Sequence, residues 1–145
     1  MGERKELKIQ CYCMNLRHIS NMLTKYYDQA LALVHITANQ FFLLYVIHFL
    51  ETCNKSELAR YTRLERTTVI RDLDILLKKD LVRQIPGPTK RNLLVCLTEE
   101  GEKTRERGEQ IWEDVQKSIS RLLGEEHLAA MEEMLKRMEA LEEKI

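Results

Sequence analysis

The fold is decided by the middle of the chain, residues 55–98, which read KSELARYTRLERTTVIRDLDILLKKDLVRQIPGPTKRNLLVCLT. This stretch first predicts two helices, over about 55–62 and 66–79, that are joined by a tight turn. At about 100° per residue, the apolar positions of the second helix fall on one face and leave the other face polar. Those apolar positions are Val69, Leu73, Leu76 and Leu77. The pattern is therefore that of a helix-turn-helix.

A β-hairpin is expected directly after this helix pair. The apolar period changes to two short β-like runs, at 81–85 and 93–97. Between them, residues 86–92 form a turn that carries two cations, Lys90 and Arg91. A cationic hairpin beside a helix-turn-helix is the outline of a winged helix. In such a motif one helix fits the major groove of DNA and the hairpin reaches the flanking minor groove.

Two further helices are expected before the winged region. Residues 7–30 carry apolar side chains at helical spacing, although no single cap marks where the helix begins. Thr37 and Gln40 then form a capping-box pattern in front of a strongly apolar segment, which predicts a buried helix over about 38–53.

A long helical region is expected after the hairpin. Thr98 is its predicted N-cap, and Gly124 divides it into helices over about 99–123 and 126–143. The last helix carries Leu and Met at spacings of three and four, which indicates a stripe that must be buried in the core or in a dimer seam.

Composition is consistent with one mainly helical domain. The chain has 145 residues, 44% hydrophobic and 32% charged, with only 2 Pro and 5 Gly. Its net charge of zero conceals an asymmetry, because residues 55–98 carry ten Lys and Arg against five Asp and Glu. Residues 99–145 carry eight Lys and Arg against fourteen Asp and Glu, so the basic middle precedes an acidic tail. This distribution favours a local contact with a polyanion.

Several other classes of protein are not expected. The longest uncharged stretch, residues 29–50, is polar in its middle, and the N-terminus has no secretory pattern. We therefore expect a cytoplasmic protein without a membrane contact. No catalytic motif, phosphate loop or metal-ligand spacing stands out, so we expect no enzyme activity, no cofactor and no metal.

Four segments, taken in this order and at these distances, carry a family resemblance. They are Ser56–Ala59 (SELA), Leu64–Leu73 (LERTTVIRDL), Leu81–Arg83 (LVR) and Val95–Gly101 (VCLTEEG). Together they resemble the MarR family of bacterial transcription regulators, over nearly the whole chain from Cys11 to about Leu141.

The resemblance implies a fold and a function. It implies a mainly α winged helix-turn-helix in a single domain, with residues 37–98 as the DNA-binding lobe. Residues 1–36 and 99–145 would be dimerisation helices. It further implies a repressor that binds a palindromic operator in double-stranded DNA as a homodimer. A small-molecule effector or thiol oxidation would release it.

The resemblance also implies which residues contact DNA. The recognition-helix positions of the family fall on Arg66, Thr67, Thr68 and Arg71, and Ser56, near the start of the first helix of the pair, is also expected to contact DNA. The family's wing usually reads Asp-Arg-Arg-Ser, where this chain has Thr89-Lys90-Arg91-Asn92. Arg91 matches the arginine that enters the minor groove, and Lys90 keeps a charge without the planar fork of arginine. The missing Asp leaves Arg91 without its usual orienting carboxylate.

The cysteines allow several interpretations. Cys11 and Cys13 are two small apolar residues, or redox sensors near a helix N-terminus, or an incomplete metal set with His18. Side chains two residues apart on a helix diverge by about 200°, so a disulfide between these two would be strained. Oxidation would more easily join two subunits or capture a small thiol. Cys53 and Cys96 are expected to be buried and inert.

A function without DNA is the alternative hypothesis. Residues 66–71 would then be a solvated helix face, and the winged helix would contact another protein. The zero net charge and the missing wing Asp motivate this hypothesis, whereas the cationic wing speaks against it. Asp72 and Asp74 would repel phosphate, although Asp74 is expected to pair with Lys78 four residues on.

Overall fold

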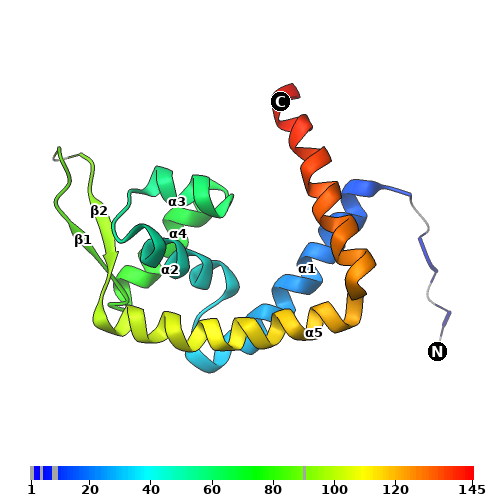
Figure 1. The fold of residues 1–145 in the computed structure, drawn as a ribbon, viewed down its shortest axis with the longest axis horizontal. Coiled ribbons are helices and arrows are strands. Elements are labelled where there is room, and N and C mark those ends of the chain that lie inside the picture. Colours follow the sequence, from blue (N-terminus) through cyan, green and yellow to red (C-terminus); the bar gives the residue numbers. More distant parts are fainter. Residues whose placement is uncertain (1, 4, 8–9, 90) are drawn as a thin grey trace.

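The computed structural model describes residues 2–3, 5–7, 10–89 and 91–145 (Figure 1). Within these residues the chain is mainly helical with one two-stranded antiparallel hairpin, as the sequence predicts. Its elements are α1 (Tyr12–Leu31), η1 (Ala32–Val34), α2 (Ala38–Leu50), α3 (Lys55–Thr62), α4 (Arg66–Lys78), β1 (Val82–Ile85), β2 (Leu94–Leu97), α5 (Glu99–Met138) and η2 (Glu139–Lys144). Figure 1 shows α2, α3, α4 and the hairpin as one lobe, with α5 passing beneath it and then turning upward beside α1.

Two helices begin where local capping dictates. At α2 the Thr37 hydroxyl accepts from the Gln40 amide at 3.3 Å, and the Gln40 side chain accepts from the Thr37 amide at 3.2 Å. Asn54 and Glu57 form the same reciprocal pair at α3. By contrast, no side-chain hydrogen bond caps α1, which begins at Tyr12 rather than at the predicted residue 7.

The predicted end of α2 is wrong by three residues. The helix ends at Leu50, and Glu51 follows with a φ of 65°. Cys53, expected inside the helix, instead forms an antiparallel bridge with Val95. Its amide donates to the Val95 carbonyl at 3.2 Å, and its carbonyl accepts from the Val95 amide at 2.8 Å. The segment after α2 is therefore drawn out of the helix to pair with β2, beside the hairpin.

The core of the lobe surrounds α2. Apolar side chains from α2, α3, α4 and both strands are almost completely buried together, which stabilises the lobe by the hydrophobic effect. They include Phe41, Leu43, Leu44, Ile47, Leu58, Val69, Leu73, Leu76, Val82 and Val95. The predicted apolar face of the second helix is thus confirmed, with Leu77 packed against this core. The opposite face of α4 is left for solvent.

A polar contact also fixes α5 against the lobe. His48 Nδ1 of α2 lies 3.0 Å from Glu102 Oε1 of α5, and Arg105 Nε donates to Glu102 Oε2 at 3.2 Å. Partial burial acts to raise the pKa of the Glu102 carboxyl, but the hydrogen bonds from His48 and Arg105 hold it below its usual value.

The break predicted in the last helical region is confirmed. Gly124 has a φ of 79° and a ψ of 165°, a conformation that L residues rarely adopt. Helix α5 changes direction at this point (Figure 1). After its second half the chain contacts the lobe again, where Arg63 Nη2 lies 3.5 Å from Glu139 Oε1.

No single helix of the described residues is both long and apolar enough to cross a membrane. The segments Tyr12–Val34 and Ala38–Leu50 are long and apolar enough only when taken together, and they are bent by 69° relative to each other.

Candidate nucleic-acid interface

The predicted recognition helix, α4, presents a polar face outward. The tight turn before it is confirmed, with Arg63 in the left-handed conformation at a φ of 57°. Arg66, Thr67 and Arg71 are exposed, while Thr68 is half-buried and presents less of its side chain than the sequence suggested. The helix therefore offers two arginines and a threonine on one accessible face.

Three of the predicted site residues, from three elements, converge on a shallow hollow that we call the wing hollow. It has a volume of about 170 Å³. Ser56 of α3, Arg66 of α4 and Arg91 of the wing all line it. Its remaining walls are Asn54, Lys55, Gln84, Asn92, Leu93 and Val95. The fold thus brings together residues that lie up to 35 positions apart in the sequence.

Arg71 lies next to this hollow rather than in it. It lines a second hollow of about 250 Å³ with Ile70, Asp74 and other residues of α4. Lys55 and Gln84 line both hollows, so the two form one continuous surface. We call this surface the recognition surface; it consists of Lys55, Ser56, Arg66, Arg71, Gln84 and Arg91.

Sequence reasoning missed two members of the recognition surface. Lys55 directly precedes Ser56, so its position after the Asn54 cap was an available signal. Nothing in the local sequence singled out Gln84, because its place depends on how β1 packs beside α3 and α4.

The wing lacks the carboxylate that would orient its arginine. Arg91 is exposed and forms no ion pair with any residue that the structure describes. This agrees with the expectation from the missing Asp. Lys90, the other predicted wing cation, lies outside the described residues.

The two acidic residues of α4 have different surroundings. Asp74 pairs with Lys78 at 2.9 Å, as predicted. Asp72 is only 5% exposed and faces the core, so its carboxylate does not lie on the outer face of the helix. It lies against Gln40 of α2, whose amide donates to Asp72 Oδ1 at 3.4 Å.

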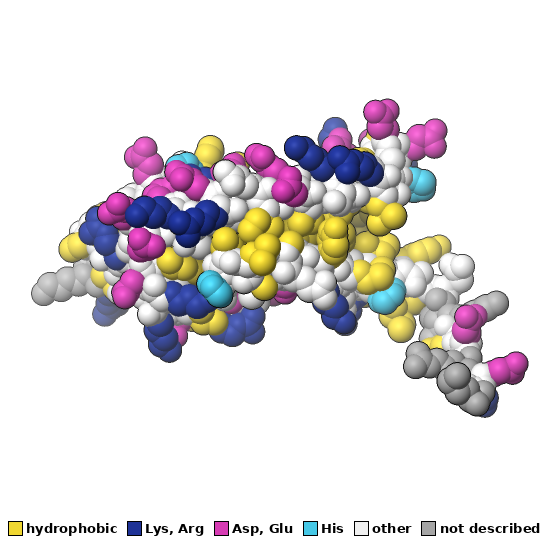
Figure 2. All heavy atoms as spheres, turned by 90° about the horizontal axis from the view of Figure 1, so that it is seen from below, with side chains coloured by type: hydrophobic (Ala, Val, Ile, Leu, Met, Phe, Trp, Pro, Cys, Tyr) yellow, Lys and Arg dark blue, Asp and Glu magenta, His cyan; other side chains and the backbone are white. Residues whose placement is uncertain are grey.

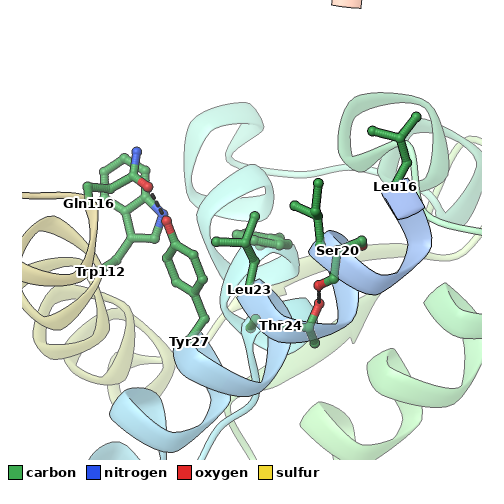
Figure 3. A pocket seen from close by; sticks show the side chains of 10 residues that line it. Leu16, Ser20, Leu23, Thr24, Tyr27, Trp112 and Gln116 are labelled. Atoms are coloured by element: carbon green, nitrogen blue, oxygen red, sulfur yellow. Dashed lines mark hydrogen bonds between the residues drawn. The ribbon is translucent and has the colours of Figure 1, made fainter. Parts of the chain in front are cut away.

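A larger hollow, of about 420 Å³, lies between α1, α2 and α5 (Figure 3). We call it the helix hollow. Its walls are mostly apolar and include Leu16, Leu23, Phe42 and Trp112. At one side the Tyr27 hydroxyl donates to the Gln116 side chain. Burial raises the pKa of the Tyr27 phenol, which therefore stays neutral. This arrangement suits a small, largely apolar molecule with a group that can hydrogen-bond.

The burial of the four cysteines agrees only in part with the expectation from the sequence. Cys11 is half-buried just before α1 and Cys13 is exposed within it. Cys53 is fully buried, and burial raises the pKa of its thiol to about 12, so this thiol is inert at neutral pH. Cys96 is half-buried rather than buried. In the described part of the chain, no three His, Cys, Asp or Glu side chains lie close enough together to hold a metal ion.

The order of elements and the hairpin that follows α4 define a winged helix-turn-helix protein. The model of the MarR family matches residues 36–93, which include α2, α3, α4 and β1. The winged lobe is therefore similar to the MarR family of transcriptional regulators.

Solved structures of MarR-family regulators resemble about nine-tenths of the chain. MosR from M. tuberculosis, in complex with DNA, has a TM-score of 0.80 and 28% identity, over 92% of this chain and 97% of that one. A cysteine-to-serine mutant of MarR from E. coli, complexed with operator DNA, has a TM-score of 0.74 and 26% identity, over 91% and 99%. The apo form of wild-type E. coli MarR has a TM-score of 0.70 and 25% identity, over 90% of this chain and 98% of that one. No curated protein matches the chain significantly by sequence.

Proposed function

We propose that this protein is a transcriptional repressor that binds a palindromic operator as a homodimer. The observation that carries the proposal is the recognition surface, on which α3, α4 and the wing present Ser56, Arg66 and Arg91 around one hollow. The crystal complexes of MosR with DNA and of MarR with operator DNA support it.

The recognition surface and the two threonines of α4 that lie outside it, Thr67 and Thr68, have separate roles on the duplex. The first turn of α4 would enter the major groove, where Thr67 and Thr68 contact base edges or a thymine methyl group. Arg71 would bind guanine in bidentate fashion or hold a phosphate. Arg91 would enter the flanking minor groove, while Ser56 and Lys55 contact the backbone.

We assign residues 1–36 and 99–145 to dimerisation and 37–98 to the DNA-binding lobe. Figure 2 shows hydrophobic side chains gathered along the face formed by α1 and α5. Large apolar side chains of both helices are exposed, including Ile19, Met22, Met131 and Leu135. A second copy of the chain would cover these side chains and place two recognition helices about 34 Å apart, one helical turn of DNA.

The first prediction concerns binding to DNA. Duplexes selected from a random pool should share a palindrome, and affinity should fall about 1,000-fold or more between about 50 and 200 mM salt, since each neutralised phosphate releases counterions. Arg91→Ala should weaken binding and reduce the slope of log affinity against log salt by about 2, because the homodimer carries two copies of Arg91 and each lost cation changes the slope by about 1. Gel shifts over a salt series measure both effects.

Arg107→Ala is the matched control for this measurement. Arg107 is exposed on α5 and lines neither part of the recognition surface, so the same loss of charge should leave the salt slope nearly unchanged. If the pool yields no enriched sequence and no salt-sensitive binding, the DNA-binding function is wrong. The winged helix would then be a protein-contact module.

We propose two routes by which the operator is released. A small molecule in the helix hollow would change how α1 and α5 pack on α2, and so the spacing of the two recognition helices. Alternatively, Cys11 or Cys13 would be oxidised. Two thiols from different subunits and one hydrogen peroxide would give one disulfide and two waters, because the two cysteines of one helix diverge.

The second prediction tests the oxidative route. If the thiols of α1 are the sensor, peroxide should release the operator from the natural protein but not from a Cys11→Ser, Cys13→Ser variant. Cys96→Ser is the control, because Cys96 is half-buried on β2 and should leave release unchanged. Equal release from the double variant and the natural protein would eliminate the thiols of α1 as the sensor.

A further inference from the structure

The recognition helix carries a buried carboxylate. Asp72 is only 5% exposed, and among the described residues no other Asp or Glu is buried. It lies between α4 and α2, next to Arg71 in the sequence. A carboxylate that has lost its water needs hydrogen bonds or a cation in return, so its surroundings are informative.

One oxygen of Asp72 is held by the residue that caps α2. The Gln40 side-chain carbonyl accepts from the Thr37 amide at 3.2 Å, as part of the capping box. This bond fixes the orientation of the Gln40 amide, so its NH₂ group points toward Asp72. It donates to Asp72 Oδ1 at 3.4 Å. The carboxylate is thereby held in place by a helix other than its own.

The other oxygen has a cation but no hydrogen bond. Asp72 Oδ2 is buried without a hydrogen-bond partner among the described residues. Arg71 Nη2 lies 3.8 Å away, and the Arg71 side chain is 69% exposed. Neighbouring residues of a helix point about 100° apart, so the Arg71 side chain must curl back over α4 to come this close. The guanidinium thus lies at the edge of the core with most of its surface free.

We propose that Asp72 is a positioning residue for Arg71. The buried carboxylate restricts the rotamers of the Arg71 side chain before DNA arrives, so less conformational entropy is lost when the guanidinium binds its base or phosphate. The proposal rests on the DNA-binding function proposed above.

The sign of the effect separates positioning from simple electrostatics. Removing a negative charge near a phosphate backbone should strengthen binding. Removing a positioning carboxylate should weaken binding to the operator, although the same charge is lost. Asp72→Asn is the appropriate change, because its amide keeps an oxygen for Gln40 and loses the attraction for Arg71.

The third prediction is a double-mutant cycle on the selected operator. Asp72→Asn should weaken operator binding about 10- to 100-fold, because each of the two subunits releases one ordered long side chain and each release costs about 3- to 10-fold. In an Arg71→Ala background it should cause no further loss, because it acts through Arg71. Asp74→Asn is the control: it removes the same charge from the same helix at an exposed site and should not weaken binding.

Two results would overturn the proposal. In the first, Asp72→Asn behaves like Asp74→Asn. In the second, it weakens binding equally with and without Arg71, which indicates a purely structural role. Thermal unfolding of each variant shows whether the fold is kept.

A measurement without DNA keeps this test separate from that of the proposed function. In NMR spectra of the free protein, the Nε–Hε group of Arg71 should be more ordered than that of Arg66 and should become equally mobile in Asp72→Asn. If no duplex binds, the DNA-binding function fails, while this comparison still decides whether Asp72 holds Arg71. Equal mobility of the two arginines in the natural protein would contradict the proposal.

Discussion

Replacing Gly101 with alanine is expected to destabilise the protein by about 3 kcal/mol or more, which for a domain of this size lowers the melting temperature by roughly 10 °C. A Cβ atom at this position would lie 1.9 Å from the Leu81 carbonyl oxygen and 2.9 Å from the Leu81 carbonyl carbon. Both are backbone atoms, which no side-chain rotation can move away. Thermal and urea unfolding measure the loss.

The backbone cannot yield easily because hydrogen bonds hold it from several sides. The Leu81 carbonyl accepts from the Thr98 amide at 3.1 Å. The Thr98 hydroxyl donates to the Asp80 carbonyl at 2.6 Å and accepts from the Gly101 amide at 3.0 Å. One corner therefore joins the end of α4, the start of β1 and the first turn of α5. Disturbing it would also shift the wing relative to the recognition helix.

Gly108→Ala is the matched control in the same helix. Gly108 is also buried, but its Cβ would meet side-chain atoms, with Phe41 Cδ2 at 3.0 Å and Ile36 Cδ1 at 3.4 Å. These side chains can shift by a few tenths of an ångström, and alanine favours the helix by about 1 kcal/mol over glycine. We expect Gly108→Ala to stay within about 1 kcal/mol of the natural protein. Similar melting temperatures for the two variants would contradict the explanation from the backbone clash.

The sequence predicted those parts of the fold that depend on neighbours in the chain. The capping box of Thr37 and Gln40 spans four residues, and it places the start of α2 correctly. The end of α2 depends on Cys53 pairing with Val95, which lies 42 residues further on, so no local pattern could give it. The segment Leu97–Gly101 (LTEEG) was only part of a family resemblance in the sequence. The structure explains two of its residues, because Thr98 caps α5 and a Cβ atom at Gly101 would clash with the Leu81 carbonyl.

The candidate site was predictable to a similar degree. The exposed face of α4 follows from the spacing of its apolar residues, and Arg66 and Arg71 lie on it as expected. The burial of Asp72 could not be predicted, because the spacing of apolar residues places a charged side chain on the outer face. It does not show that a hydrogen-bond partner such as Gln40 lies in the core. The shared hollow of Ser56, Arg66 and Arg91 required the packing of three elements.

Leu135→Glu is expected to make the protein monomeric and to weaken binding to a full palindrome by about 100- to 10,000-fold. Leu135 is 55% exposed on the second half of α5, within the stripe that also contains Met131 and Met138. A carboxylate at this position would lose its water in a dimer seam without gaining a partner. Because two linked recognition helices bind far more tightly than one, loss of the dimer removes that advantage. Sedimentation velocity measures the mass, and gel shifts on the palindrome measure the affinity.

Affinity for a single half-site of the palindrome distinguishes loss of the dimer from damage to the DNA-binding lobe. Leu135 lies outside the lobe, so affinity for a single half-site should be the same in the variant and in the natural protein. Ala129→Glu is the control, because Ala129 is exposed on the same helix but lies outside the apolar stripe by the step of about 100° per residue. It should remain dimeric and bind the palindrome normally. A Leu135→Glu protein that stays dimeric would show that the apolar stripe of α5 is not the dimer seam. Another surface would then have to hold the two recognition helices in register.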